Sequence, residues 1–523
     1  MRISQGRKIL TGIFMAENNS AIHSVAVIGA GTMGRGIAYL LAQNGIRTLL
    51  YNRSGNNLNQ ARDYIIRDLD KKIDGGKISP QKKGEILANL VFSPIFEAIA
   101  DSDLVIETIA EHEATKHEIL AAIAATVKKE AIIATNTSSL SLNKLAAGVE
   151  NNARFIGLHF FNPAPLMKLI EIIPSYFTSR ATSLRCQQLV TAIGKQFVVC
   201  KATPGFIVNR MARPFYLEGF RLLEENVALA PQIDRALKAG GHFRMGPLEL
   251  TDFIGQDINY QVSSQIWQDM QYDPRYTPGH LQRSLVDAGL LGKKNGRSFF
   301  TPSSAEPSSA DAGSGTPTSL NFYGEHPLFD LLQQRALALW PRVQINRQSE
   351  QPTLGRFIRV NDAMAIKITD GRTANLLAEL TELDTFVIDA ALNYADTAYL
   401  AAAHSQDASA ANKALFLTLL QTLIPQVEFI KDSPGLIVAR VLSSLINESV
   451  IMVESGVCSR ADIDIAAVAG VNYADGIFSW LAQLGQKNVK STLDNMAQLL
   501  HSARYYPHYS LLNTPRPELA VAP

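Results

Sequence analysis

Two stretches of this chain repeat each other at a constant separation of 230 residues, and this repeat constrains the fold more than any other feature. Residues 203–255 align with residues 433–485 without a gap. A register kept over that length does not arise by chance, so both stretches must take the same fold. Their apolar residues recur at helical spacing, which predicts two copies of one helical domain. The identical pairs include Pro204/Pro434, Gly205/Gly435, Arg210/Arg440, Glu218/Glu448, Glu224/Glu454, Ile233/Ile463, Asp234/Asp464, Gly246/Gly476 and Gly255/Gly485.

With 523 residues the chain is too long for a single hydrophobic core. The stretch between the two copies begins with residues rich in Ser, Pro, Ala and Gly, which favour a flexible linker. It continues with strand-like segments that lack a glycine-rich phosphate loop. We therefore predict an N-terminal tail at 1–20, a dinucleotide-binding domain at 21–201, a helical domain at 202–300, a linker at 301–320, a reduced α/β module that binds no dinucleotide at 321–431, and the second helical copy at 432–523.

Residues 23–50 have the pattern of a strand, a glycine turn, a helix and a second strand. The turn carries a G-x-G-x-x-G motif formed by Gly29, Gly31 and Gly34, with Thr32 and Met33 between them. Glycines at such a turn let the backbone approach a pyrophosphate at the helix N-terminus. The pattern predicts a Rossmann-type, doubly wound α/β sheet that binds a nicotinamide dinucleotide. Further apolar runs at residues 104–110, 131–138 and 155–161 continue the sheet.

The end of the second strand bears on the choice of cofactor. An Asp or Glu that bonds to the ribose hydroxyls usually stands there, whereas this chain has Asn52, followed by Arg53 and Ser54. An Arg beside a Ser suits a 2′-phosphate, because Arg supplies a charge-assisted fork and Ser a hydroxyl. Alternatively, Asn52 still bonds to the 2′-hydroxyl and Arg53 lies in an exposed loop. We expect NAD, with NADP as a second option because of Asn52 and Arg53.

The run GLHFFNPAPLMKLIEII at residues 157–173 suggests a catalytic pair. His159 lies near the end of one strand, and Glu171 lies twelve residues later in a second strand, after a turn that carries Asn162. A hairpin would bring the two side chains together. A histidine held by a carboxylate keeps one tautomer and becomes more basic, which suits removal of a hydroxyl proton. The alternative is a structural histidine, since the chain has ten.

The segment EHEATKH at residues 111–117 resembles a zinc signature, but its spacing is wrong. His112 and His117 are five residues apart, and Lys116 stands where the second ligand would fall. We expect no metal here. The segment instead predicts the start of a solvated helix, with Glu111 near the cofactor.

Overall composition narrows the class of partner. The formal charge is +1, with 46% hydrophobic and 19% charged residues, so nothing indicates binding to nucleic acid or to a membrane surface. No apolar run reaches the length of a membrane span. The three widely spaced cysteines build neither a disulfide framework nor a metal cluster, which favours the reducing cytoplasm.

Several motifs together resemble the 3-hydroxyacyl-CoA dehydrogenase family from residue 23 to about residue 300. They are VAVIGAGTMGRGIA, LVIE, NTSSLS, GLHFFNPAPLMKLIEII, TPGFIVNR and FRMGPLELTDFIGQDI. The repeated helical domain, LGKKNG at 291–296 and the C-terminal RYYPHYSLL resemble the long bacterial form from phenylacetate catabolism, whose substrate is 3-hydroxyadipyl-CoA. The resemblance implies a dehydrogenase that acts on an acyl-CoA such as 3-hydroxyadipyl-CoA or 3-hydroxybutyryl-CoA.

The resemblance also implies roles for single residues. His159 would take the proton of the 3-hydroxyl while hydride leaves C3, and Glu171 would stabilise the imidazolium. Ser138 and Asn209 would donate hydrogen bonds to the 3-oxygen, and Asn136 in the same NTSS motif would contact the cofactor. The second helical copy has Ala439 in place of Asn209 and lacks an equivalent of the His159 hairpin. It should therefore be structural and pair with the first copy, so we expect one active site per chain, in a monomer or a homodimer.

Basic residues suggest contacts to the substrate. Arg213 follows Asn209 by four residues and so shares its helical face, where it could meet the far carboxylate of a dicarboxylic acyl chain. A surface ion pair with Glu218 or another acidic neighbour is the competing interpretation. Lys72 and Lys77 could meet the CoA phosphates, although solvated surface lysines are the usual case.

Two other functions compete. An NADP-dependent β-hydroxyacid dehydrogenase would fit Asn52 and Arg53, but it should use a catalytic lysine instead of the His159–Glu171 pair. A non-catalytic acyl-CoA-binding scaffold would fit the degenerate second half, but it would not need the pair.

Overall fold

A computed structural model of the chain describes residues 21–300 and 315–512. The predicted tail at 1–20 and most of the predicted linker lie outside the described residues. The chain divides into two units, residues 1–206 and residues 207–523, and each is described by itself. None of the described helices is long and apolar enough to cross a membrane.

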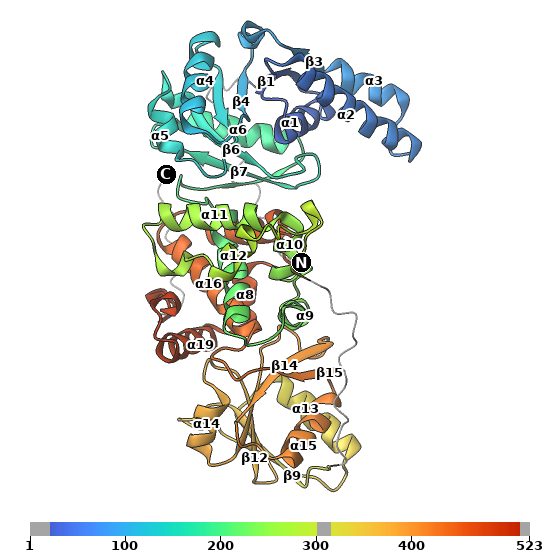
Figure 1. Cartoon of the computed structure of the whole chain (residues 1–523), viewed down its shortest axis with the longest axis vertical. Helices are drawn as coiled ribbons and strands as arrows, with labels where there is room; N and C mark the ends of the chain where they lie inside the picture. The colour runs from blue at the N-terminus through green and yellow to red at the C-terminus, as the bar shows by residue number, and fades with distance from the viewer. Residues whose placement is uncertain (1–20, 301–314, 513–523) are drawn as a thin grey trace, which may run out of the picture. The chain divides into compact units, whose positions relative to one another are not determined.

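The first unit is built on an eight-stranded sheet of order β3-β2-β1-β4-β5-β6-β7-β8. All neighbours are parallel except β6 and β7, which are antiparallel. The strand order reverses beside β1, so the helices that precede the reversal and those that follow it cover opposite faces of the sheet (Figure 1). The strands are β1 Ser24–Ile28, β2 Arg47–Tyr51, β3 Leu90–Ser93, β4 Leu104–Glu107, β5 Ile132–Thr135, β6 Phe155–Phe160, β7 Leu169–Pro174 and β8 Gln196–Val199. The helices are α1 Thr32–Gln43, α2 Gly55–Asp74, α3 Pro80–Ala88, α4 Glu113–Thr126, α5 Leu142–Ala147 and α6 Arg180–Ala192.

The predicted doubly wound sheet is therefore confirmed. Its central strands are continuous apolar runs because helices cover both of their faces, and Val27, Ile106 and Ile133 are all fully buried. This packing leaves the carboxyl ends of β1, β4 and β5 at one edge, where the loops that carry polar residues begin.

The second unit contains the two helical copies. The first copy comprises α7 Val208–Met211, α8 Arg213–Glu224, α9 Ala230–Gly240, α10 Pro247–Ile254, α11 Gln256–Asp269 and α12 His280–Asp287. The second comprises α16 Val438–Glu454, α17 Arg460–Ile465, α18 Ile477–Leu484 and α19 Gln486–Leu499. The copies pack against each other mainly through α8 and α16. Both stretches are helical, as predicted.

A seven-stranded sheet of order β10-β9-β11-β12-β13-β14-β15 lies between the two helical copies in the sequence. This is the predicted reduced α/β module, and its first strand begins inside the range predicted for the linker. Its strands are β9 Ser319–Tyr323, β10 Gln344–Gln348, β11 Phe357–Val360, β12 Met364–Ile368, β13 Asp384–Ile388, β14 Tyr399–His404 and β15 Gln426–Phe429. Its helices are α13 Pro327–Leu339, α14 Ala374–Thr381 and α15 Ala410–Gln421.

The prediction that the second copy lacks the His159 hairpin was wrong. The 230-residue register continues upstream, because β7 and β8 correspond to β14 and β15 with identical lengths. β13 and β14 are antiparallel and correspond to the β6–β7 hairpin. Asp389 stands at the position of His159, and Ala401 at that of Glu171. The backbone of the hairpin was retained while the side chains that reveal it in a sequence were replaced.

Asp389 has a different task from His159. Its carboxylate is fully buried and accepts main-chain hydrogen bonds of 2.8 to 3.1 Å at the N-terminus of α16. Burial raises the pKa of Asp389 to about 6, and the backbone N–H donors oppose that rise. The group thus fastens the reduced module to the second helical copy. The donors are the N–H groups of Ala390, Ile437, Val438 and Ala439.

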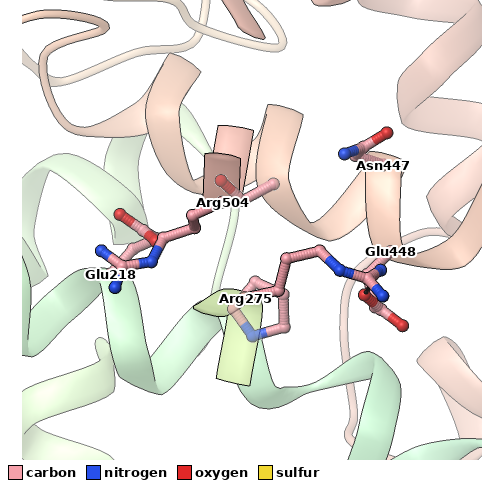
Figure 2. Close-up of a pocket in the computed structure, with 7 residues that line it drawn as sticks. Glu218, Arg275, Asn447, Glu448 and Arg504 are labelled. Carbon is pink, nitrogen blue, oxygen red and sulfur yellow. Dashed lines mark hydrogen bonds and ion pairs between the residues drawn. The ribbon is translucent and has the colours of Figure 1, made fainter. Parts of the chain in front are cut away.

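Buried charges join the two helical copies in a reciprocal pattern. Arg210 donates to Glu448 at 2.7 Å, and its repeat equivalent Arg440 donates to Glu218, also at 2.7 Å. All four side chains are almost fully buried. Tyr505 adds a hydrogen bond to Glu218 at 2.8 Å. Figure 2 shows the small pocket beside these pairs, with Glu218, Arg275, Asn447, Glu448 and Arg504 around it.

We expect Glu218→Gln to lower the free energy of unfolding by about 3–5 kcal/mol at pH 7, because the buried Arg221 loses its carboxylate and the buried Arg440 keeps only the partly exposed Glu225. Burial alone would raise the pKa of Glu218, but Arg221 and Arg440 outweigh it and hold the pKa at about 2. The carboxylate therefore stabilises the fold above its ordinary pKa, and this contribution is lost as the pH falls toward 2. The difference in free energy of unfolding between wild type and Glu218→Gln should therefore be smaller at low pH than at pH 7.

Chemical denaturation at pH 7 and at pH 2.5 measures both effects. Glu225→Gln is the matched control, since Glu225 also binds Arg440 but its side chain is 37% exposed, and it should cost at most about 1 kcal/mol. Equal losses in the two variants would contradict the argument.

Candidate active site

The glycine turn after β1 has the shape that a pyrophosphate requires. Gly29 has φ +110°, and a Cβ on Gly34 would lie 1.8 Å from the Gly29 carbonyl oxygen. These two glycines are therefore required by the turn itself. A Cβ on Gly31 would meet nothing within 4 Å, so open space lies in front of the start of α1. No side chain caps α1, and its first turn contains no acidic residue. The N–H groups at this end fit a bound phosphate group.

Thr32 and Met33 form the first two positions of α1, at the edge of this open space. Thr32 is exposed and Met33 is half-buried against the core. Their position is consistent with the predicted contact to a cofactor.

The residues after β2 are arranged as a turn into α2. The Asn52 Oδ1 accepts a hydrogen bond from the Ser54 N–H at 2.9 Å, and the Ser54 Oγ accepts one from the Asn57 N–H. The Ser54 hydroxyl therefore caps a helix. Arg53 is exposed, and no hydrogen bond or ion pair of its side chain occurs among the described residues. Of the three residues, only Arg53 has a side chain entirely available to a ribose phosphate.

His159 and Glu171 form the predicted pair. They lie directly opposite each other in the antiparallel ladder of β6 and β7. The His159 Nδ1 and the Glu171 Oε2 are 2.6 Å apart, and the glutamate is fully buried. The rings of Phe161 and Phe206 pack against the imidazole, with centroids at 4.5 and 5.9 Å. Because Nδ1 donates to the carboxylate, Nε2 is the nitrogen able to accept a proton.

Asn136 links the carboxyl ends of β5 and β6, since its Oδ1 accepts a hydrogen bond from the Phe160 N–H at 2.8 Å. Its amide N–H groups point away from that bond and remain able to donate. Asn162 is exposed in the turn after β6 and precedes a cis peptide bond to Pro163. Both asparagines therefore lie within a few residues of His159.

A buried ion pair between Lys116 and Glu107 was missed by the sequence analysis. Their Nζ and Oε1 atoms are 2.6 Å apart, and neither side chain is more than 2% exposed. The segment 111–117 does begin α4, but the prediction that it is solvated was wrong for Lys116, because Glu107 pulls it into the protein. A charged residue that ends an apolar strand was the only signal in the sequence.

The same lysine also organises the segment that carries Ser138. Its Nζ lies 3.4 Å from the Glu111 carboxylate. Glu111 in turn accepts hydrogen bonds from the Ser138 N–H at 2.9 Å and from the Thr137 hydroxyl. The Ser138 hydroxyl is half-buried and has no hydrogen-bond partner among the described residues. Glu111 is therefore a positioning group for Ser138.

The remaining predicted residues are spread over the two units. Lys72 binds Asp68 at 2.9 Å and the Tyr39 hydroxyl at 2.9 Å, so much of its charge is already used. Lys77 is exposed after α2. Asn209 lies on α7 of the second unit and is half-buried. His112 caps α4 through its Nδ1, and the described residues contain no cluster of three metal-ligating side chains.

Arg213 begins α8 and is 4% exposed. The competing interpretation, an ion pair with Glu218, was wrong, because Glu218 binds Arg221 and Arg440 instead. Arg213 donates to the Asn209 carbonyl at 2.7 Å and to the Ser263 hydroxyl at 2.9 Å.

The first unit thus combines a dinucleotide-binding turn with a histidine base oriented by a carboxylate, and these features define a nicotinamide-dependent dehydrogenase. The chain matches the family of the 3-hydroxyacyl-CoA dehydrogenase NAD binding domain at residues 24–203. It matches the C-terminal domain of the same enzymes at residues 205–302 and again at 435–514. Residues 366–434 match the 3-hydroxybutyryl-CoA dehydrogenase reduced Rossmann-fold domain. The chain belongs to the 3-hydroxyacyl-CoA dehydrogenase family.

Individual relatives agree over most of the chain. A 3-hydroxyadipyl-CoA dehydrogenase of Escherichia coli K12 is 36% identical over 93% of this chain and 96% of its own length. A crystal structure of 3-hydroxybutyryl-CoA dehydrogenase from the same organism has 34% identity and a TM-score of 0.85, covering 94% of this chain and 98% of its own. A 3-hydroxybutyryl-CoA dehydrogenase of Bradyrhizobium diazoefficiens is 39% identical over 55% of this chain and 98% of its length.

We expect Lys116→Met to lower the free energy of unfolding by about 3–5 kcal/mol, because it leaves the buried Glu107 carboxylate without its cation. Lys128→Met is the control, since Lys128 binds Asp103 with a side chain that is 41% exposed, and it should cost about 1 kcal/mol or less. Denaturant titration measures both values. A loss in Lys116→Met no larger than in the control would show that the pair does not stabilise the strand ends.

Proposed function

We propose that the chain oxidises the 3-hydroxyl of a 3-hydroxyacyl-CoA to the 3-oxo group, with NAD as the oxidant and a dicarboxylic acyl chain, as in 3-hydroxyadipyl-CoA, as the substrate. 3-Hydroxybutyryl-CoA is the second candidate. The observation that supports the reaction is the 2.6 Å contact between His159 and Glu171 in the sheet that carries the glycine turn. The names of the relatives support the substrates.

His159 acts as the base. Its Nε2 takes the proton of the 3-hydroxyl as the C3–H bond breaks, so that the substrate loses one proton and one hydride. The nicotinamide, when bound, supplies the acceptor for that hydride. The positive charge that forms on the imidazole is stabilised by Glu171, whose carboxylate has no exposure to water. The pair is therefore set before the substrate arrives.

Two further groups act on the oxygen. We assign to the Ser138 hydroxyl and the Asn209 amide the donation of hydrogen bonds to the 3-oxygen, which polarise it as the carbonyl forms. Ser138 is prepared for this role by Glu111, which fixes its main chain. Asn136 would contact the cofactor and Asn162 the substrate, both from turns near His159.

Neither alternative function has comparable support. A β-hydroxyacid dehydrogenase would need a catalytic lysine. Lys116 is buried near the turns of the first unit, but its charge is neutralised by Glu107. A binding scaffold would have no use for a buried His159–Glu171 contact.

The cellular compartment, the pathway and the partners of the enzyme are proposals as well. We place the enzyme in the cytoplasm, in phenylacetate catabolism or β-oxidation, with the acyl-CoA as its partner and no nucleic acid or membrane. Because the helical copies already pair within one chain, monomer and homodimer both stay predictions, which analytical ultracentrifugation distinguishes.

The catalytic assignment predicts that His159→Ala lowers kcat about 10³-fold or more with 3-hydroxyadipyl-CoA, because proton removal by a positioned base contributes about 10²- to 10⁴-fold. Glu171→Gln keeps the shape of the pair but removes the charge, and should lower kcat by a smaller factor. Initial rates at saturating NAD measure both. Turnover of His159→Ala within tenfold of wild type, in a folded protein, would overturn the assignment.

The cofactor assignment predicts that Asn52→Asp raises the ratio of kcat/KM for NAD over NADP by about tenfold, because the new carboxylate bonds to the ribose hydroxyls and repels a 2′-phosphate. Arg53→Ala should lower kcat/KM for NADP more than that for NAD, because it removes the exposed guanidinium. Parallel assays with both cofactors test this. If neither variant changes the ratio, these residues do not contact the ribose.

A further inference from the structure

The charge of Arg213 has no counterpart in the described part of the protein. Its Nε and Nη1 donate to the Asn209 carbonyl and the Ser263 hydroxyl, but Nη2 has no acceptor, and no carboxylate lies within ion-pair distance. Burial lowers the pKa of Arg213. A buried guanidinium without an anion is costly, and an apolar residue would fill the same space more cheaply. Stability therefore does not explain why Arg213 is buried at this position.

A second donor without a partner is buried near this guanidinium. The Tyr473 hydroxyl has no hydrogen-bond partner among the described residues, and the charge of Arg213 acts on it. Burial raises the pKa of Tyr473 well above its usual value, so the hydroxyl stays neutral and able to donate. Tyr216 completes the group, since its ring lies 4.8 Å from the guanidinium carbon of Arg213. Both groups are donors that lack an acceptor, and a carboxylate would accept their hydrogen bonds and carry the missing charge.

The repeat shows that these residues are not needed to join the helical copies. The interface charges Arg210 and Glu218 recur as Arg440 and Glu448. By contrast, Arg213 is replaced by Ser443 in the second copy. The position of Tyr473 is held by Phe243 in the first copy, and the two rings pack edge to face at 5.0 Å. Neither Arg213 nor Tyr473 therefore has a polar equivalent of its own kind in the other copy.

The spacing fits a six-carbon dicarboxylic chain. Asn209 lies on α7 and Arg213 begins α8, and the Arg213 Nε donates to the Asn209 carbonyl at 2.7 Å, so the two residues are about one helical turn apart. In an adipyl chain, C3 is separated from the terminal carboxyl carbon by three bonds of about 1.5 Å each. A substrate whose 3-oxygen meets Asn209 would therefore carry its free carboxylate about one helical turn away.

We propose that Arg213 and the Tyr473 hydroxyl, over the ring of Tyr216, bind the terminal carboxylate of a dicarboxylic acyl chain. This inference rests on the proposed function. It gives the second helical copy a part in substrate selection, because Tyr473 belongs to that copy. An acyl chain of the same length that ends in a methyl group would leave the donors unpaired and is selected against.

The test compares 3-hydroxyadipyl-CoA with 3-hydroxyhexanoyl-CoA, which has the same chain length and no carboxylate. The measured quantity is the ratio of kcat/KM for the two substrates. We expect Arg213→Met to lower this ratio about 100-fold, through KM, since a charge-assisted contact is lost. Arg213→Lys should restore part of it, because a lysine keeps the charge but not the fork.

Tyr473→Phe is the variant least able to disturb the fold, because a phenylalanine already stands at the equivalent position 243. It should lower the ratio about tenfold. Arg244→Met is the control, since Arg244 is an exposed arginine of the same helical copy, and it should leave the ratio unchanged. Thermal unfolding of each variant shows whether it is folded.

Three results would overturn the inference. They are an unchanged ratio in Tyr473→Phe and Arg213→Lys, an equal loss with both substrates in each variant, or a loss of the ratio in Arg244→Met. Failure of the proposed function looks different, because wild type would then turn over neither substrate. In that case calorimetric binding of adipyl-CoA and hexanoyl-CoA still tests the carboxylate site, with a preference for adipyl-CoA expected in wild type and reduced in Tyr473→Phe.

Discussion

The reciprocal ion pairs between the helical copies are the constraint on which the second unit depends. Arg210 and Arg440 are buried, and each finds its carboxylate, Glu448 or Glu218, only on the other copy. Each copy folded alone would leave its arginine without the carboxylate that it binds across the interface. The two copies must therefore fold as one body, although the whole seven-stranded sheet lies between them in the sequence.

The second half of the chain keeps the hairpin of the first half but not its catalytic pair. The hairpin that carries His159 and Glu171 persists in the second half, but Asp389 and Ala401 occupy the two positions. Asp389 accepts main-chain hydrogen bonds from the start of α16, and its carboxylate thereby fills the place where a catalytic side chain would stand. A short carboxylate such as that of Asp389 can accept these main-chain hydrogen bonds and so cap the helix.

The sequence was sufficient for the layers of the fold and for the catalytic pair, because both depend on local patterns. Alternating apolar runs and the glycine motif predict the first sheet, and twelve residues with a turn between them predict that His159 and Glu171 meet. It was insufficient where a contact joins residues without a fixed spacing. The burial of Lys116 against Glu107 and the approach of Tyr473 to Arg213 depend on tertiary packing, and the hairpin around Asp389 is hidden because its identifying side chains have changed.

Joining both copies in one chain removes a restriction that symmetry would impose. In a dimer of identical subunits, a tyrosine placed at position 243 or 473 would appear at both, and so would an arginine at 213 or 443. The covalent repeat lets the two sides differ, and Arg213 and Tyr473 are two of the positions at which they do. Arg210 and Glu218, whose partners lie on the other copy, stay the same in the repeat. Glu218, which joins the copies, and Arg213, which distinguishes them, both lie on α8, five residues apart.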